Sequence, residues 1–465
     1  VEYYCTIFTV AESTVEAGVL WTGSDDGLVH VSRDGGKGWS NVTPPELPEW
    51  AQINCIEADP FEKGGAWVAA TRYKLDDFRP YLFVTTDYGA TWRRCDTGID
   101  PHWFTRCVRA DPVQRGMVYA GTERGVWLSY NFGRSWQRLQ RNLPITPVTD
   151  LCVRDGALIA ATQGRAFWSF DHLPHLRQLT PDLSLREAYL FEPVPFVQLP
   201  GSDKEEPMAG RNPASAPVIR IRMGGDAKAP VDTTAKVEVL DGKGKALWTR
   251  DSKAEKEEEK LKLVRGMNTL RFEPKFEDAK GFDGMILWSG GLGGPRKLPP
   301  GDYVVKFTFG ESSQQQTLRI LKDPRSPSSV AELQAKYDLV VRARDTITKA
   351  HEAILEIRAL RTQLDAVVGR SEGDAKKELE AKAKAVKESL TAIEEALYQT
   401  KSKSSQDPLN YPIRLTDKLA GVMSAVNGSE FGPTAGQQGV ADTLVAAIGK
   451  ELETYEQAKK EGLAA

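Results

Sequence analysis

Three short segments of the chain place an acidic or amide side chain, a glycine and a tryptophan at the same spacing. They read SRDGGKGW (32–39), TTDYGATW (85–92) and SYNFGRSW (129–136). A carboxylate such as Asp34 or Asp87 could in principle be catalytic. It can also accept the backbone N–H groups of its own turn, where glycine supplies a positive φ without steric cost. We interpret this segment, an Asp box, as a structural turn at the outer rim of a sheet.

The tryptophan that ends each Asp box is expected to fold back over the turn. Burial of an indole removes about 150 to 250 Å² from water, which contributes about 4 to 6 kcal/mol before the entropy cost. Gly38 replaces the hydroxyl residue of the other copies, and Asn131 replaces the aspartate in the third. The predicted structural residues are Asp34, Trp39, Asp87, Trp92, Asn131 and Trp136.

A second set of charged and aromatic side chains lies in loops that we expect at the face opposite the Asp boxes. Carboxylates, guanidiniums and aromatic faces around one opening could bind a glycan or a peptide. The same residue types are also typical of any polar rim. The candidate ligand-binding residues are Asp25, Asp26, Asp76, Asp77, Glu123, Arg124, Arg165 and Trp103.

Glycoside hydrolysis is the chemistry that such carboxylates could perform. It needs two carboxyl groups about 5 Å apart for retention, or about 6.5 to 9.5 Å apart for inversion. Neighbours such as Asp76 and Asp77 point to opposite sides of a strand, so a working pair would have to come from different repeats. The sequence identifies no such pair. It contains no nucleophile elbow, HExxH, Walker loop or EF-hand loop, and we predict no metal and no cofactor.

The Asp boxes belong to a longer repeat of about 40 to 50 residues, a period typical of propellers and solenoids. Segments before the boxes read GVLWTGS, GAWVAAT and GMVYAGT, and a fourth copy, GALIAAT, has no Asp box after it. Further upstream lie CIEADP, CVRADP and CVRD. The order strand, strand, strand, Asp box, strand is that of a propeller blade. Residues 1–182 are therefore predicted to form four blades of a β-propeller.

Two further regions follow. Residues 183–325 alternate apolar and polar side chains at period two in several runs, which predicts a small immunoglobulin-like or fibronectin III-like antiparallel β-sandwich. Within it, 201–216 reads as a solvated loop. Residues 326–465 carry four amphipathic stripes, two long and two shorter, which predict an α-helical bundle.

Composition limits the class of protein. The chain has 465 residues, 40% of them hydrophobic, and a net charge of -3, so there is no basic excess to suggest a nucleic-acid partner. No apolar run reaches the length of a membrane span. Five cysteines without CxxC spacing indicate free buried thiols. The sequence begins at Val1, so we expect either a removed leader or a fragment of a longer protein.

The quoted motifs resemble those of bacterial secreted proteins with sortilin-like, neuraminidase-type Asp-box (BNR) repeats, often labelled glycosyl hydrolases. Further segments carry the resemblance in the same order, including GMILWSGG, LPPGDYVVKFTF and DPLNYPIRLTDKLAGV. It implies export to the periplasm or beyond. Because family members are longer, it also implies that these blades are the rear part of a larger propeller, whose other blades are absent, cleaved away or on another chain. Gln163 stands where the family often has histidine.

Two functions are consistent with these observations. The first is a secreted, non-catalytic recognition or scaffold protein that binds a peptide, protein or glycan at the propeller mouth. The second is an Asp-box glycoside hydrolase that uses carboxylates from different blades. The fold alone does not choose between them. A desolvated carboxylate paired with another in an open cleft would favour hydrolysis.

Overall fold

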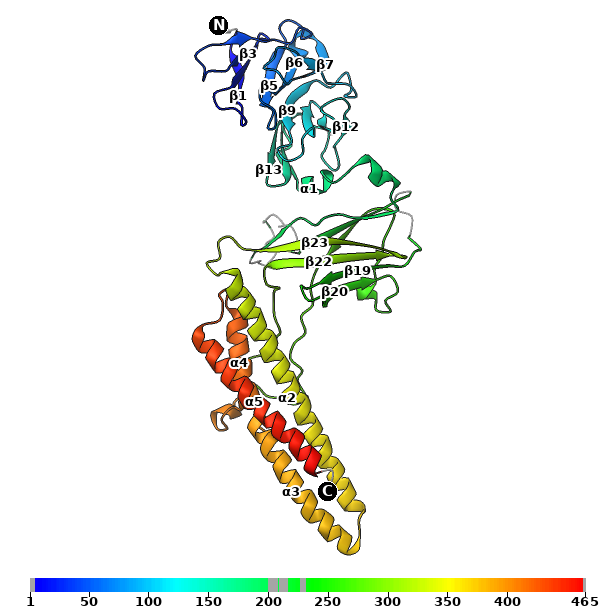
Figure 1. Cartoon of the computed structure of the whole chain (residues 1–465), viewed down its shortest axis with the longest axis vertical. Coiled ribbons are helices and arrows are strands. Elements are labelled where there is room, and N and C mark those ends of the chain that lie inside the picture. Colours follow the sequence, from blue (N-terminus) through cyan, green and yellow to red (C-terminus); the bar gives the residue numbers. More distant parts are fainter. Residues whose placement is uncertain (1–4, 200–207, 209–215, 226–230, 463–465) are drawn as a thin grey trace. The chain divides into compact units, whose positions relative to one another are not determined.

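The computed structural model describes residues 5–199, 208, 216–225 and 231–462 (Figure 1). The chain divides into two compact units, Val1–Pro181 and Asp182–Ala465, and each is described by itself. The division into three domains stays a prediction, because the sheets and helices of the second half belong to one unit. The predicted loop 201–216 lies almost wholly outside the described residues.

The first unit consists of four successive antiparallel sheets, which we call blades 1 to 4. In each blade the strands are paired in chain order, so every connection is a hairpin. Blade 1 contains β1 (Ile7–Glu12), β2 (Leu20–Ser24), β3 (Val29–Ser32) and β4 (Ser40–Asn41); blade 2 contains β5 (Gln52–Ala58), β6 (Ala66–Arg72), β7 (Asp77–Thr85) and β8 (Arg93–Arg94). Blade 3 contains β9 (Thr105–Ala110), β10 (Val118–Thr122), β11 (Gly125–Ser129) and β12 (Gln137–Arg138); blade 4 contains β13 (Val148–Arg154), β14 (Ala157–Thr162) and β15 (Phe167–Phe170), followed by the short helix α1 (Leu173–Leu176).

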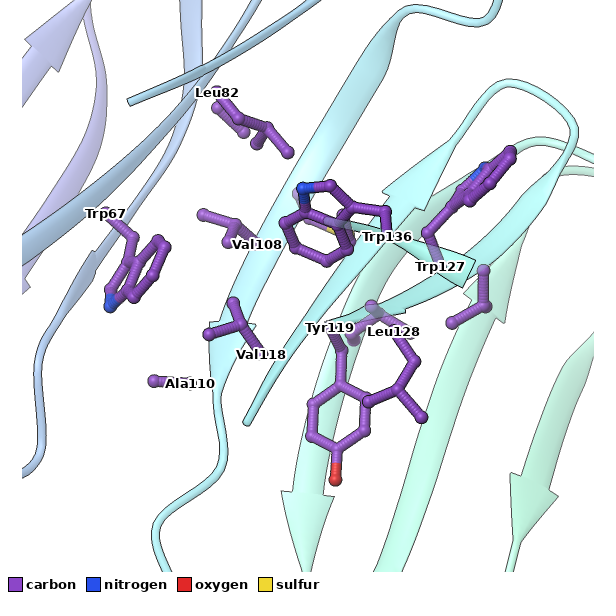
Figure 2. Close-up of a cluster of buried hydrophobic side chains, with 14 of the residues drawn as sticks. Trp67, Leu82, Val108, Ala110, Val118, Tyr119, Trp127, Leu128 and Trp136 are labelled. Atoms are coloured by element: carbon purple, nitrogen blue, oxygen red, sulfur yellow. The ribbon is translucent and has the colours of Figure 1, made fainter. Parts of the chain in front are cut away.

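Apolar side chains fill the spaces between neighbouring blades. Trp21 and Val31 of blade 1 share a core with Val68 and Phe83 of blade 2. A second core joins blades 2, 3 and 4, and Figure 2 shows Trp67, Val108 and Trp136 within it. Both faces of the middle strands are buried, so these strands read as near-continuous apolar runs.

The first strands of the four blades, β1, β5, β9 and β13, lie beside one another in that order. This arrangement places the first strand of each sheet innermost. The described residues form four blades side by side, and they do not form a closed ring.

The second unit begins with two sheets that enclose one hydrophobic core. One sheet has the order β16-β18-β21 and the other β17-β23-β22-β19-β20. The prediction that all strands of this region pair antiparallel was wrong for one pair, because β17 pairs with β23 in parallel. The strands are β16 (Ala188–Leu190), β17 (Phe196–Gln198), β18 (Val218–Met223), β19 (Ala235–Leu240), β20 (Ala246–Asp251), β21 (Gly266–Arg271), β22 (Gly301–Phe309) and β23 (Ser312–Lys322).

Four helices complete the second unit, as the amphipathic stripes predicted. Ser329 and Glu332 form a capping box at the start of α2, which satisfies two backbone N–H groups. The buried carboxylate of Glu394 on α3 accepts hydrogen bonds from Arg358 and Arg361 on α2. None of the described helices is long and apolar enough to cross a membrane. The helices are α2 (Val330–Arg370), α3 (Gly373–Leu397), α4 (Leu415–Gly428) and α5 (Ala435–Gly462).

A segment without regular secondary structure, residues 276–294, packs against the helices; we call it the strap. Asp417 on α4 accepts the backbone N–H groups of Trp288 and Ser289, at 2.9 and 2.8 Å. The phenol oxygen of Tyr398 accepts the N–H of Ile286 at 2.9 Å. These contacts give the strap's backbone groups the partners that a strand or helix would otherwise supply.

Candidate functional site

The inner strands of blades 1 to 4 line an open groove of about 660 Å³. Side chains on a strand alternate between its two faces, so about every second residue of an inner strand can reach the groove. Its lining includes polar and charged residues from all four blades. They include Thr9, Thr14, Asn54, Glu57, Arg106, Arg109, Thr149 and Asp150.

Arg109 connects three blades at the floor of the groove. Its Nη2 lies 2.6 Å from Oδ1 of Asp150 in blade 4, and its Nη1 lies 3.5 Å from Oε2 of Glu57 in blade 2. Its Nε donates to the carbonyl of Leu151 at 2.8 Å. The guanidinium therefore holds two carboxylates of different blades in one cluster. At this cluster, a ligand in the groove would meet the guanidinium of Arg109 between two carboxylates.

Glu57 is the carboxyl group whose protonation is most altered in this cluster. Its burial between the inner strands raises its pKa from 4.5 to about 7, and the nearby positive charge of Arg109 opposes this rise only in part. A carboxyl group with this pKa can hold or release a proton near neutral pH. Its partner across the guanidinium, Asp150, has a more exposed side chain.

Three cysteines accompany the charged cluster, and the residues of the groove include all of them. Burial raises the pKa of the Cys55 thiol, although Nη1 of Arg109 lies only 2.7 Å from its sulfur. Burial also raises the pKa of Cys107, and Cys152 is exposed. None of the described cysteines forms a disulfide. Among the described residues, no three His, Cys, Asp or Glu side chains are grouped as metal ligands.

The eight predicted ligand-binding residues lie outside this groove. Asp77 is buried and is bound within its own blade, because Arg79 donates to both carboxylate oxygens and Tyr81 donates from its phenol at 2.7 Å. The hydrogen bonds from Arg79 are the main reason that the pKa of Asp77 lies below its usual range. Its neighbour Asp76 is exposed and adopts a left-handed conformation with φ of 59°.

The remaining predicted residues are also held by local contacts. Asp25 accepts the backbone N–H of Thr6 at 2.9 Å, and Asp26 accepts the hydroxyl of Ser24. Glu123 pairs with Arg106 of the groove at 2.6 Å. The guanidinium of Arg124 lies 5.8 Å from the ring centre of Trp103. The carbonyl of Arg165 accepts the indole N–H of Trp168, and the Arg165 side chain is exposed.

The Asp boxes have the internal hydrogen bonds that the sequence predicted. Asp34 accepts the N–H groups of Lys37 and Gly38, both at 2.9 Å. Asp87 accepts the N–H of Thr91, and the amide oxygen of Asn131 accepts that of Ser135, again at 2.9 Å. An amide oxygen thus performs the same role as a carboxylate, which supports the structural interpretation of these turns.

The tryptophans of the boxes differ from the prediction in where they bind. The indole N–H of Trp92 donates to the carbonyl of Val42, and that of Trp136 to Cys95, each at 2.6 Å. Both acceptors belong to the preceding blade. Only Trp39 folds over its own turn, where it donates to Gly36 at 3.1 Å. Two of the three indoles therefore connect blades rather than cover a turn.

The groove residues were not singled out by sequence reasoning, which looked only at loops. A signal was present in the repeated segments CIEADP and CVRADP, where Glu57 and Arg109 occupy the same place in an otherwise apolar strand. A charged residue repeated in an innermost strand would have pointed to the groove. Asp150 carries no comparable signal, because the strand positions that correspond to it in blades 2 and 3 hold Cys55 and Cys107.

Comparisons with known proteins are weak. No protein-family model and no curated protein sequence matches the chain. Among solved structures, YCF48 bound to D1 peptide is 18% identical with a TM-score of 0.29, over 36% of this chain and 52% of that one. The GH74 xyloglucanase from Xanthomonas campestris is 15% identical with a TM-score of 0.29, over 36% and 29%.

An ancestral GH74 enzyme is 15% identical with a TM-score of 0.27, over 67% of this chain and 40% of the enzyme. The chain thus spans about half or less of each of these proteins. At such TM-scores the similarities carry no argument about ligand or activity. The blades are identified by the strand order of the chain itself.

Proposed function

We propose that the first unit binds an extended peptide or glycan in the groove along the inner strands. The observation that supports this most directly is the cluster of Glu57, Arg109 and Asp150, which gathers charges from three blades at the floor of one open groove. Hydroxyl and amide side chains around it, such as Thr149 and Asn54, could orient a polar ligand by hydrogen bonds. The predicted mouth residues, such as Asp76 and Arg165, would at most extend this surface.

The groove is tested best by a variant that fills it without removing a charge. Thr149 is exposed on an inner strand and lines the groove, so Thr149→Trp should block a ligand while the cluster stays intact. Asp150→Asn should weaken binding of a cationic or hydroxyl-rich ligand by roughly tenfold, the value of one charged hydrogen bond. The matched control is Val113→Trp, because Val113 is 66% exposed and lies outside the groove.

The measurement is binding to a glycan array and to a library of extended peptides, with the wild type and the three variants in parallel. We expect hits that are lost in Thr149→Trp and kept in Val113→Trp. Binding of the same ligands by Thr149→Trp would contradict the proposal. It would favour a site at the predicted mouth residues, such as Asp76 and Glu123.

A second candidate function is glycoside hydrolysis in the same groove. It is favoured by Glu57, whose pKa of about 7 suits a general acid, with Asp150 of another blade as the second carboxylate. The guanidinium of Arg109 between them would then have to share its position with the substrate.

Hydrolysis predicts that Glu57→Gln abolishes turnover of fluorogenic oligosaccharides while ligand binding persists, because the amide cannot donate the proton. Asp87→Asn should leave turnover unchanged, since Asp87 belongs to a structural turn. A wild-type protein that binds a sugar and never cleaves it would leave recognition as the function.

We further propose that blade 1 packs against another propeller blade, supplied by a partner chain or fragment. Trp39 is 43% exposed, and Ile7 and Val10 on β1 are 64% and 66% exposed, although the corresponding face of blade 2 is buried against blade 1. The family resemblance of the sequence supports such a larger propeller and export. The two sheets around one core in the second unit support an immunoglobulin-like sandwich there. Native mass spectrometry tests the partner, and cell fractionation tests export to the periplasm or medium.

A further inference from the structure

A small pocket in the second unit brings three cationic side chains together. It encloses about 110 Å³ between the end of β17, residues 295–300, the first turns of α2 and the end of α4. Arg296 and Lys297 come from the segment after the strap, and Lys336 comes from α2. Cations from two separate elements therefore face the same space.

The positive charges of this pocket are only partly neutralised. Lys297 lies 3.8 Å from the carboxylate of Glu430, and Lys336 donates to the carbonyl of Ser429. Within the described part of the chain, Arg296 forms no ion pair. Three cations therefore face one carboxylate. Burial lowers the pKa of Lys336; the carboxylate of Glu430 opposes this change, and the like charges of Lys297 and Arg296 add to it.

Apart from the charged groups and the side-chain amides of Gln198 and Asn427, the walls of the pocket are apolar. The apolar part includes Pro295, Pro299, Leu333, Tyr337 and Val340. Two wider clefts, of about 420 and 380 Å³, adjoin the pocket, and Arg296 lines both of them. The space beside the cations can therefore hold more than a bare ion.

We propose that this pocket binds a small organic anion, with its acid group among Arg296, Lys297 and Lys336 and its apolar body against α2. An anion would relieve the repulsion between the three cations, and a planar guanidinium binds two oxygens of a carboxylate or phosphate at once. The apolar walls select for a ligand with a hydrocarbon part over an inorganic ion. The proposal concerns the second unit alone and does not depend on the function of the groove.

The test uses the full chain with three probes, phenylacetate, phenyl phosphate and inorganic phosphate, and with benzyl alcohol as a neutral control. Binding is measured by isothermal titration calorimetry. We expect phenylacetate or phenyl phosphate to bind at least roughly tenfold more tightly than inorganic phosphate and benzyl alcohol, and the better of the two identifies the acid group.

Arg296→Gln should weaken the better probe by roughly tenfold or more, because it removes a charged hydrogen bond from an exposed side chain without disturbing the core. Lys336→Met should do the same. Lys262→Gln, whose cation pairs with Glu257 in the same unit, is the control and should bind like the wild type. Equal affinities in the wild type and Arg296→Gln would overturn the proposal, as would inorganic phosphate binding as well as phenyl phosphate.

Discussion

The tryptophans of the Asp boxes occupy equivalent positions but should contribute different amounts to the free energy of unfolding. Trp136 is 8% exposed and Trp39 is 43% exposed, although each is the last residue of an Asp box. Trp136→Ala should therefore lower the free energy of unfolding of the first unit by about 3 to 5 kcal/mol, as large core truncations do. Trp39→Ala should cost less than about 1 kcal/mol. Urea unfolding followed by circular dichroism would compare the two, and equal losses would contradict the role assigned to the indoles that connect blades.

The raised pKa of Glu57 predicts that the stability of the first unit depends on pH. Its pKa is 4.5 in an unfolded chain and about 7 in the folded one, so between these values the folded state keeps a proton that the unfolded state has lost. The stability that this proton contributes is thus fully present below about pH 4.5, and it is lost as the pH rises from there through about 7. Glu57→Gln should remove this decline, on the order of 3 kcal/mol at most. Denaturant unfolding of the wild type and of Glu57→Gln at about pH 5 and pH 8 would measure this decline. An equal fall in the free energy of unfolding of both proteins between these pH values would contradict the prediction.

At the scale of the element, the Asp box is a hydrogen-bonding device that does not need a charge. Asn131 holds its turn through the same contact as Asp87. Asp87→Asn should accordingly change stability by less than about 1 kcal/mol. Asp87→Ala leaves the N–H of Thr91 and the hydroxyl groups of Thr85 and Thr91 without their acceptor, and should cost about 1 to 3 kcal/mol. Thermal melts of the two variants test this. A large loss in Asp87→Asn would show that the negative charge itself matters.

The sequence predicted the strands and helices better than the residue-by-residue alignment of the repeated strands. The strands of the blades and the helices of the second unit were predicted, because periodic apolar residues and repeated turns are local signals. The alignment of GAWVAAT with GMVYAGT was wrong by one residue: Trp67 donates to Asp59 as Tyr119 donates to Asp111. The glycine equivalent to Gly116 is Gly64 and not Gly65, since the carbonyls of Gly64 and Gly116 accept the backbone N–H groups of Tyr88 and Phe132. Two adjacent glycines give no local signal of which one is equivalent.

The candidate site was harder to predict than the elements, for a physical reason. The groove depends on Glu57, Arg109 and Asp150 meeting across three blades, and such contacts follow from the packing of sheets. Likewise the hydrogen bonds between the strap and Asp417 join residues more than a hundred positions apart. Neither is encoded in local patterns.

At the scale of the whole molecule, the division after Pro181 predicts separate folding of two units. Fragments 1–181 and 182–465 should each unfold cooperatively, because each has its own hydrophobic core. Calorimetry of the full chain should resolve two transitions, and Trp136→Ala should lower only the one that belongs to fragment 1–181. A single transition that shifts as a whole would contradict this independence.

The direction of the indole contacts bears on how the first unit is made. Trp92 and Trp136 each reach back to a carbonyl of the blade that precedes them in the chain. A ribosome releases the N-terminal blade first, so each newly emerging tryptophan finds its acceptor already synthesised. Assembly can then advance one blade at a time behind the exit tunnel, and no nascent intermediate has to wait for a later segment to satisfy a buried indole.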